Sequence, residues 1–169
     1  MSRIFRLSLV FFFILGLDIA TKVFIHTFFP QPLYEEVYPY GGLGVFQGLF
    51  GGIDFDITHV INRGGAWGMF AAIPKTLLTV RVVVVAFLAV YLLFLQKSGH
   101  RQLPLAFILA GASGNILDSF LYGHVIDMFH FTFWGYSFPV FNVADFAICI
   151  GFFLLVCSSL FSKKKAAVL

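Results

Sequence analysis

Charged residues are scarce in this chain of 169 residues: Asp, Glu, Lys and Arg make up 11% of the sequence, whereas hydrophobic residues make up 60%. A soluble domain carries about 25% charged residues. The composition therefore excludes an ordinary soluble domain and indicates an integral membrane protein. The length suits one compact helical bundle, so we expect a single membrane domain over residues 1–169.

Cysteine is also rare, since only Cys149 and Cys157 occur, eight residues apart in one apolar run. On a helix this spacing is about 12 Å of rise, too far for a disulfide. The histidines share no helical ligand spacing: they are His26, His59, His100, His124 and His130. The sequence therefore predicts no disulfide framework and no metal site.

Long apolar runs predict four transmembrane helices, because each run is long enough to cross the hydrocarbon core. They lie at about residues 7–28, 76–95, 103–121 and 140–161. The first run follows Arg3 and Arg6, as in a secretory signal peptide. A cut after Ala20 would, however, follow Asp18 and Ile19 rather than small residues, so we expect an uncleaved first helix.

Residues 30–75 form the longest segment outside the apolar runs. Six of the twelve residues in its stretch 41–52 are glycine. Apolar and polar residues then alternate from Ile53 to Thr58, which predicts a short strand. We expect a small β-containing platform on the membrane surface, although the glycine-rich part could instead be a flexible flap or a plain linker.

Basic residues gather on one side of the four expected helices. Seven of the eleven basic residues fall there and none of the eight acids does: Arg3, Arg6, Lys97, Arg101, Lys163, Lys164 and Lys165. The positive-inside bias therefore predicts that both termini are cytoplasmic. The expected fold is an all-α polytopic membrane protein with four transmembrane helices and an extracytoplasmic platform.

Acids and amides interrupt the apolar sequence of residues 111–146. An ionisable group in hydrocarbon costs roughly 2.5–3.5 kcal/mol on insertion scales, so each is a functional candidate. Asn115 and Asp118 lie three residues apart on the third expected helix, and Asn142 and Asp145 repeat this spacing on the fourth. Each pair therefore shares one helix face.

Asp127 follows the third expected helix on a segment long enough to return it to Asp145. Two carboxylates within hydrogen-bonding reach do not both ionise cheaply, so one keeps a proton and the other acts as a base. Such a pair can activate water and then protonate a leaving amine. Asp18 and Lys22, four apart on the first helix, can also pair. The nearby serines, Ser137 among them, have no base that the sequence identifies.

The residues alone favour peptide hydrolysis at the outer membrane face. A small proton, ion or lipid transporter that uses the intramembrane acids is the alternative, and a lipid-binding scaffold without chemistry is a third interpretation. Proton flux in vesicles would distinguish a transporter from an enzyme. A scaffold would keep its function after Asp127→Asn.

Five motifs follow one another along the chain: Asp18 to Lys22, Asn62 to Gly68, Gly111 to Asp118, Val125 to Met128, and Phe141 to Asp145. In this order they resemble the D-x-x-[ST]-K, N-x-G-A-[AW]-[FW]-G, G-x-x-G-N-x-x-D, V-x-D-[FM] and F-N-x-A-D boxes of the lipoprotein signal peptidases. That family, the type II signal peptidases, consists of bacterial membrane aspartyl proteases.

The resemblance implies an aspartic endopeptidase of the bacterial inner membrane, with its active site near the outer face. Such an enzyme removes the signal peptide from diacylglyceryl-modified prolipoproteins before the lipidated cysteine, without a cofactor. The resemblance assigns catalysis to Asp127 and Asp145. It assigns substrate-binding or supporting roles to Asp18, Lys22, Asn62, Gly64, Asn115, Asp118 and Asn142. The expected partners are prolipoprotein substrates and membrane lipids, without nucleic acid, and we expect a monomer.

The sequence departs from the family pattern in two places. Ser119 stands where the family commonly has an arginine, so a basic contact to substrate or lipid is absent or comes from elsewhere. The glycine-rich segment before Asn62 is longer than is usual in the family, which leaves the shape of the platform open.

Overall fold

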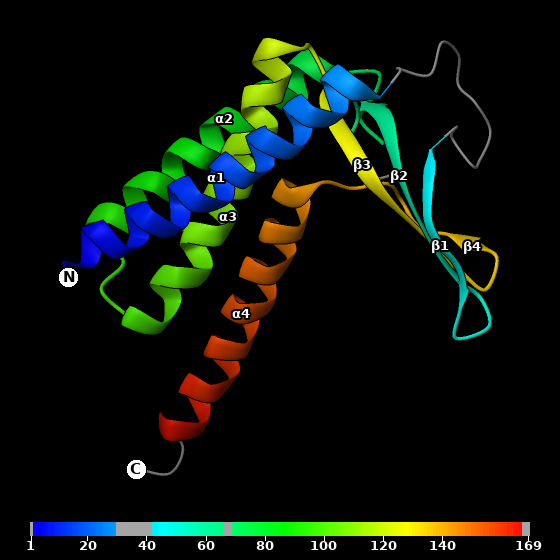
Figure 1. The fold of residues 1–169 in the computed structure, drawn as a ribbon. Helices are drawn as coiled ribbons and strands as arrows, with labels where there is room; N and C mark the ends of the chain where they lie inside the picture. The colour runs from blue at the N-terminus through cyan, green and yellow to red at the C-terminus, as the bar shows by residue number, and fades with distance from the viewer. Residues whose placement is uncertain (1, 30–41, 66–68, 167–169) are drawn as a thin grey trace. The chain divides into compact units, whose positions relative to one another are not determined.

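Four long helices and a four-stranded antiparallel sheet make up the described part of the chain (Figure 1). The structure, a computed structural model, describes residues 2–29, 42–65 and 69–166. The helices are α1 (Arg3–Phe28), α2 (Pro74–Val90), α3 (Gly99–Leu121) and α4 (Val143–Ala166), and the short π-helix η2 (Tyr91–Leu95) continues α2. Four helical segments are long and apolar enough to cross a membrane, which confirms the four predicted helices.

Several helix boundaries differ from the expected ones. α1 and α3 each begin four residues earlier than expected, at Arg3 and Gly99. α4 begins at Val143 instead of residue 140, because Phe141 forms an antiparallel bridge with Phe129 and keeps the preceding chain extended. Asp145 consequently lies in the first turn of α4.

The chain divides into two compact units that share α1, α2 and α3. The helical unit consists of Met1–Asp18, Thr79–Ile116 and Val143–Leu169, and the sheet unit consists of Ile19–Leu78 and Leu117–Asn142. The expectation of one membrane domain stays a prediction.

Small residues let the helices of the helical unit approach closely. Ile14, Ala110 and Ala147 form one buried apolar cluster. A Cβ atom added to Gly111 would collide with the carbonyl oxygen of Ala144. These contacts show that α3 and α4 pack backbone against backbone at small residues.

The sheet of the sheet unit has the order β1-β2-β3-β4 with every pair antiparallel. Its strands are β1 (Leu43–Leu49), β2 (Ile53–Asn62), β3 (Val125–Phe133) and β4 (Tyr136–Ser137). β2 confirms the predicted strand, and β1 shows that much of the glycine-rich stretch is a strand. β3 and β4 were not expected. Residues 30–41 of the predicted platform lie outside the described residues.

β2 has one more residue than β3 in the middle of their pairing. Ile57 lies opposite Phe129 and Val60 lies opposite Asp127, so three steps along β2 match two steps along β3. A β-bulge of this kind interrupts the regular alternation of side chains in one strand only.

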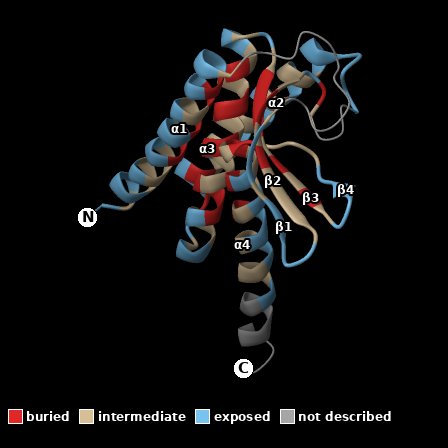
Figure 2. Cartoon of the chain, turned by 45° about the vertical axis from the view of Figure 1, so that its right-hand side comes forward, coloured by how far each residue is buried: buried red, intermediate tan, exposed pale blue. Residues whose placement is uncertain are grey.

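The two faces of the sheet differ in chemistry. Asp56 lies opposite His130 on one face, whereas Phe55 lies opposite Phe131 on the other, with ring centroids 4.5 Å apart. β3 is buried over much of its length (Figure 2). β3 joins β4 through a two-residue turn, Trp134 and Gly135, in which both φ angles are positive, as in the tightest hairpin turns.

Candidate active site

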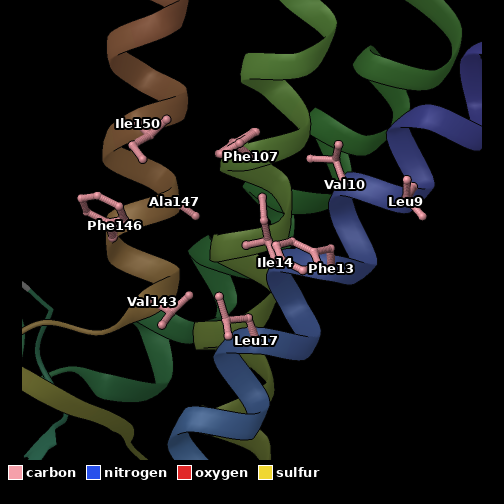
Figure 3. Close-up of a pocket in the computed structure, with 10 residues that line it drawn as sticks. All are labelled: Leu9, Val10, Phe13, Ile14, Leu17, Phe107, Val143, Phe146, Ala147 and Ile150. Carbon is pink, nitrogen blue, oxygen red and sulfur yellow. The ribbon is translucent and has the colours of Figure 1, made fainter.

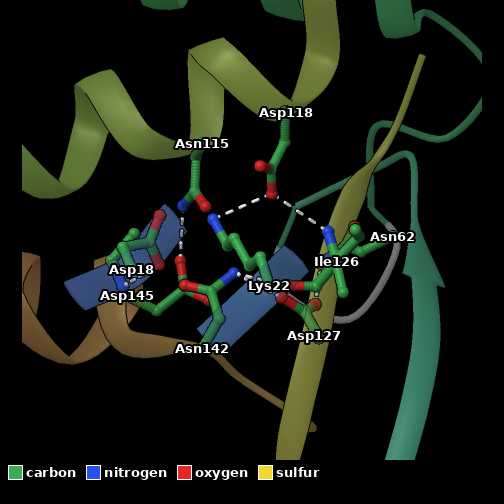
Figure 4. Close-up of polar contacts among 10 residues, drawn as sticks. Asp18, Lys22, Asn62, Asn115, Asp118, Ile126, Asp127, Asn142 and Asp145 are labelled. Carbon is green, nitrogen blue, oxygen red and sulfur yellow. Dashed lines mark hydrogen bonds and ion pairs between the residues drawn. The ribbon is translucent and has the colours of Figure 1, made fainter. Parts of the chain in front are cut away.

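Asp127 of β3 accepts a hydrogen bond from an asparagine amide at each carboxylate oxygen (Figure 4). Asn62 of β2 donates from Nδ2 to Oδ2 over 2.8 Å, and Asn142, just before α4, donates from Nδ2 to Oδ1 over 2.7 Å. Asp127 is 1% exposed and Asn142 is fully buried. Two neutral donors therefore fix the orientation of this carboxylate and complement its negative charge.

A tight turn holds Asn62 in place for this contact. Its Oδ1 atom accepts the backbone N–H groups of Gly64 and Gly65 over 3.0 and 2.9 Å. This is the Asx-type turn for which asparagine is preferred, and Gly65 adopts a φ of 72°. Gly64 thus acts through its amide group. Residues 66–68 of the same motif lie outside the described residues.

Lys22 of α1 and Asp118 of α3 form a buried ion pair with an Nζ–Oδ2 distance of 2.8 Å. Their side chains are 1% and 5% exposed. The same Oδ2 atom accepts the backbone N–H of Ile126 over 3.2 Å, one residue before Asp127. Asp118 therefore connects the end of α3 to the start of β3. The expected pairing of Asp18 with Lys22 stays a prediction.

In the helical unit, Asn115 of α3 donates from Nδ2 to Oδ1 of Asp145 over 2.8 Å. Asp18 of α1 is 1% exposed, and its Oδ1 atom accepts the backbone N–H of Ala144 over 2.9 Å, in the first turn of α4. A carboxylate at this position satisfies one of the unpaired amides of a helix start and interacts favourably with the helix dipole.

The structure places the expected site residues in two polar groups. The group in the sheet unit contains Lys22, Asn62, Gly64, Asp118, Asp127 and Asn142. The group in the helical unit contains Asp18, Asn115 and Asp145. The pairing of Asp127 with Asp145 stays a prediction. Sequence reasoning missed the backbone amides of Gly65, Ile126 and Ala144 as donors, because a backbone group leaves no mark in the residue pattern.

Three histidines of the sheet unit have a pKa below the ordinary value, and burial is the largest cause for each. The carbonyl oxygen of Phe29 partly offsets the lowered pKa of His59, and Asp56 partly offsets that of His130. For His124, the positive charge of Arg63 adds to the decrease in pKa. These imidazoles are therefore predominantly neutral at physiological pH.

The described residues include no cluster of three or more His, Cys, Asp or Glu side chains that could hold a metal ion. The two cysteines are both free. Catalysis without a metal stays a prediction.

An apolar cavity of about 490 Å³ lies between α1, α3 and α4 within the helical unit (Figure 3). Ten apolar residues line it: Leu9, Val10, Phe13, Ile14, Leu17, Phe107, Val143, Phe146, Ala147 and Ile150. Val143 and Phe146 come from the first turn of α4, the turn that also carries Asp145. The cavity therefore places hydrocarbon-compatible space beside one of the expected catalytic residues.

The protein family described as signal peptidase (SPase) II matches residues 10–161 of the chain. The lipoprotein signal peptidase of Desulforapulum autotrophicum is 37% identical over 164 residues, which cover 94% of this chain and 93% of the relative. The lipoprotein signal peptidase of Chlamydia trachomatis serovar L2 is 37% identical over 132 residues, which cover 77% of this chain and 79% of the relative.

Two solved structures described as bacterial membrane enzymes have a similar fold. The first is 26% identical, with a TM-score of 0.76 over 97% of this chain and 93% of that chain. The second is 27% identical, with a TM-score of 0.72 over 94% of this chain and 95% of that chain.

Proposed function

Because the chain belongs to the signal peptidase II family, we propose that it cleaves the signal peptide from prolipoproteins with Asp127 and Asp145 as its catalytic aspartates. The observation that carries the proposal is the amide environment of both carboxylates. Asn62 and Asn142 donate to Asp127. Asn115 donates to Asp145. A carboxylate held by neutral donors keeps a fixed orientation and still has lone pairs available for a water molecule.

In the proposed reaction the two carboxylates share one proton. The ionised carboxylate takes a proton from water as the water oxygen attacks the scissile carbonyl carbon. The protonated carboxylate gives its proton to the leaving amine. At the end of the reaction, the carboxylate that was ionised is therefore protonated, and the one that was protonated is ionised. An acid–base pair of this kind needs no nucleophilic side chain and no covalent intermediate.

The proposed substrate carries a diacylglyceryl group on the cysteine that follows the scissile bond. The apolar cavity of the helical unit supports this substrate, because acyl chains in it would contact only apolar side chains. The diacylglyceryl chains also anchor the precursor in the hydrocarbon layer that surrounds this cavity. A lipidated precursor should therefore bind far better than the same peptide without lipid.

We further propose that the enzyme is a monomer of the bacterial inner membrane, with both termini in the cytoplasm. The support is the basic residues at the helix ends, among them Arg3, Arg6 and Arg101, on a side that carries no acid. In this orientation Asp145, in the first turn of α4, lies toward the outer face, where a lipid-anchored substrate presents its scissile bond. Family membership favours peptidase activity over the transporter and scaffold alternatives.

The decisive experiment incubates the purified protein with a lipidated precursor peptide and with its unlipidated counterpart. We expect cleavage before the cysteine in the lipidated peptide only, unaffected by a metal chelator. Equal cleavage of both peptides would remove the role of the lipid. Activity that a chelator abolishes and zinc restores would contradict the two-aspartate mechanism.

A further inference from the structure

Three polar side chains from three strands form a chain of contacts on the polar face of the sheet. Ser137 Oγ of β4 lies 2.9 Å from His130 Nε2 of β3. On the other side of the same imidazole, His130 Nδ1 lies 3.6 Å from Asp56 Oδ2 of β2. The order hydroxyl, imidazole, carboxylate is that of a serine nucleophile, its general base and the acid that orients the base.

Strand register explains why these residues meet. Asp56 is the direct cross-strand partner of His130, and Ser137 is the partner of Thr132, two residues further along β3. Positions two apart on a strand share a face, so Ser137 is a diagonal neighbour of His130. Asp127 is three residues from His130 and faces the opposite side of the sheet. The contact chain is therefore separate from the proposed aspartate site.

The three groups differ in burial, and burial affects the protonation of the imidazole. The His130 side chain is fully buried and the Asp56 side chain is 10% exposed, whereas Ser137 is exposed. Burial lowers the pKa of His130, although the charge of Asp56 opposes the decrease. Neutral His130 can therefore direct Nδ1–H toward Asp56 and accept the hydroxyl proton of Ser137 at Nε2. The distance of 3.6 Å between His130 Nδ1 and Asp56 Oδ2 is longer than a hydrogen bond, and such catalytic contacts often shorten only when substrate binds.

We propose that Ser137 is a nucleophile that hydrolyses carboxylic esters, with His130 as its general base and Asp56 as the positioning residue. Ser137 Oγ attacks the ester carbonyl carbon, and its proton passes to His130 Nε2. The tetrahedral adduct expels the alcohol, which takes that proton, and an acyl group stays on Ser137. Water then attacks the acyl carbon and gives a proton to His130, which returns it to Ser137 as the carboxylic acid leaves.

The chain contains its own control for this proposal. Ser98 Oγ lies 2.9 Å from His100 Nδ1, so it also has an imidazole within hydrogen-bonding distance. The only acids of the helical unit are Asp18 and Asp145, and these bind the Ala144 amide and Asn115. In the part of the chain that the structure describes, no acid forms an ion pair with His100, whereas His130 lies near Asp56.

The first test exposes the full chain in detergent to a fluorophosphonate probe, which reacts with activated serines, and maps the adduct by mass spectrometry. We expect an adduct on Ser137 and none on Ser98. Absence of an adduct on Ser137, or labelling of Ser98 at the same rate, would overturn the proposal.

The second test measures hydrolysis of p-nitrophenyl butyrate. Ser137→Ala should abolish ester turnover while cleavage of a lipidated precursor peptide continues. Asp56→Asn should lower kcat about 10-fold or more with an unchanged KM, because a misoriented base transfers protons poorly. Unchanged ester turnover in Ser137→Ala, loss of both activities in that variant, or an unchanged kcat in Asp56→Asn would each contradict the assignment.

Discussion

The sheet unit and the helical unit bury very different numbers of polar residues. Nine of the described buried polar residues lie in the sheet unit: Lys22, Asp56, Thr58, His59, Asp118, Asp127, His130, Thr132 and Asn142. Three lie in the helical unit: Asp18, Gln96 and Asn115. A helix satisfies its own backbone, so the helical unit depends on close packing of small and apolar side chains. The sheet unit depends on specific partners for buried charges.

The largest expected effect concerns one residue from each unit. Asp127→Asn and Asp145→Asn should each reduce cleavage of a lipidated precursor by about 10²–10⁴-fold, because one water molecule needs both a base and an acid. The double variant should lose little more, since the two groups act together. Turnover of each variant in detergent is the measurement. A single variant with near-normal turnover, while still folded, would show that its unit does not contribute to the chemistry.

The next effect concerns the buried ion pair of the sheet unit. Lys22→Met leaves the Asp118 carboxylate buried without its cation, which should cost about 3–5 kcal/mol of stability. Thermal unfolding in detergent measures the loss. The control is the double variant Lys22→Met and Asp118→Asn, which removes both charges but keeps an acceptor for the Ile126 amide. It should recover much of the lost stability. Equal destabilisation of the single and double variants would argue against a charge effect.

The helical unit should respond to volume instead of charge. Gly111→Ala inserts a methyl group against the Ala144 carbonyl and the Ile148 side chain, so it should destabilise the protein by about 1–3 kcal/mol. Gly16→Ala is the matched control, because nothing lies within 4 Å of its added Cβ. It should stabilise α1 by about 0.5–1 kcal/mol through helix propensity. The same sign of change in both variants would contradict the close packing of α3 on α4.

The smallest expected effect is a dependence of stability on pH that comes from the sheet unit. Burial lowers the pKa values of His59 and His130 below the ordinary 6.5, so the unfolded chain binds protons more readily than the folded chain. Their stabilising contribution is complete above pH 6.5 and decreases as the pH falls below it. The unfolding temperature should therefore decrease by a few degrees from about pH 7.5 to about pH 5.5.

The substitution His59→Gln tests whether the pH dependence of stability comes from this histidine. The glutamine amide can still donate to the Phe29 carbonyl, which lies 3.1 Å from His59 Nδ1, but it does not titrate. The variant should show a flatter dependence of unfolding temperature on pH than the wild type. An identical dependence would assign the effect to other groups.

The sequence predicted the helices and one strand because their patterns are regular. The helical segments are long and apolar. The alternation from Ile53 to Thr58 marks β2. β3 escaped prediction although Phe129, Phe131 and Phe133 alternate with His130 and Thr132, because its first half, Val125 to Met128, is buried on both faces and shows no period of two. A strand of this kind resembles any short apolar run.

The sequence identified the residues of the candidate site, but it did not identify which of these residues contact one another. The spacing along one helix suggested a partner for Lys22 at Asp18, whereas its ion pair with Asp118 joins positions 96 residues apart in sequence. The contact of Ser137 with His130 depends on the hairpin between β3 and β4, and neither strand was expected from the sequence. Such contacts depend on the register between paired strands. The register can be deduced only when it is known which strands pair.

The bulge in β2 makes the number of residues in this strand as important as their identity. In a regular strand Asn62, five positions after Ile57, would face the side opposite Ile57. The extra residue turns Asn62 to the side of Phe129 and Asp127, where its amide lies 2.8 Å from the Asp127 carboxylate. An in-frame loss of a single codon between Ile57 and Val60 would therefore remove this contact as completely as a substitution of Asn62, although every residue of the motif would still be encoded.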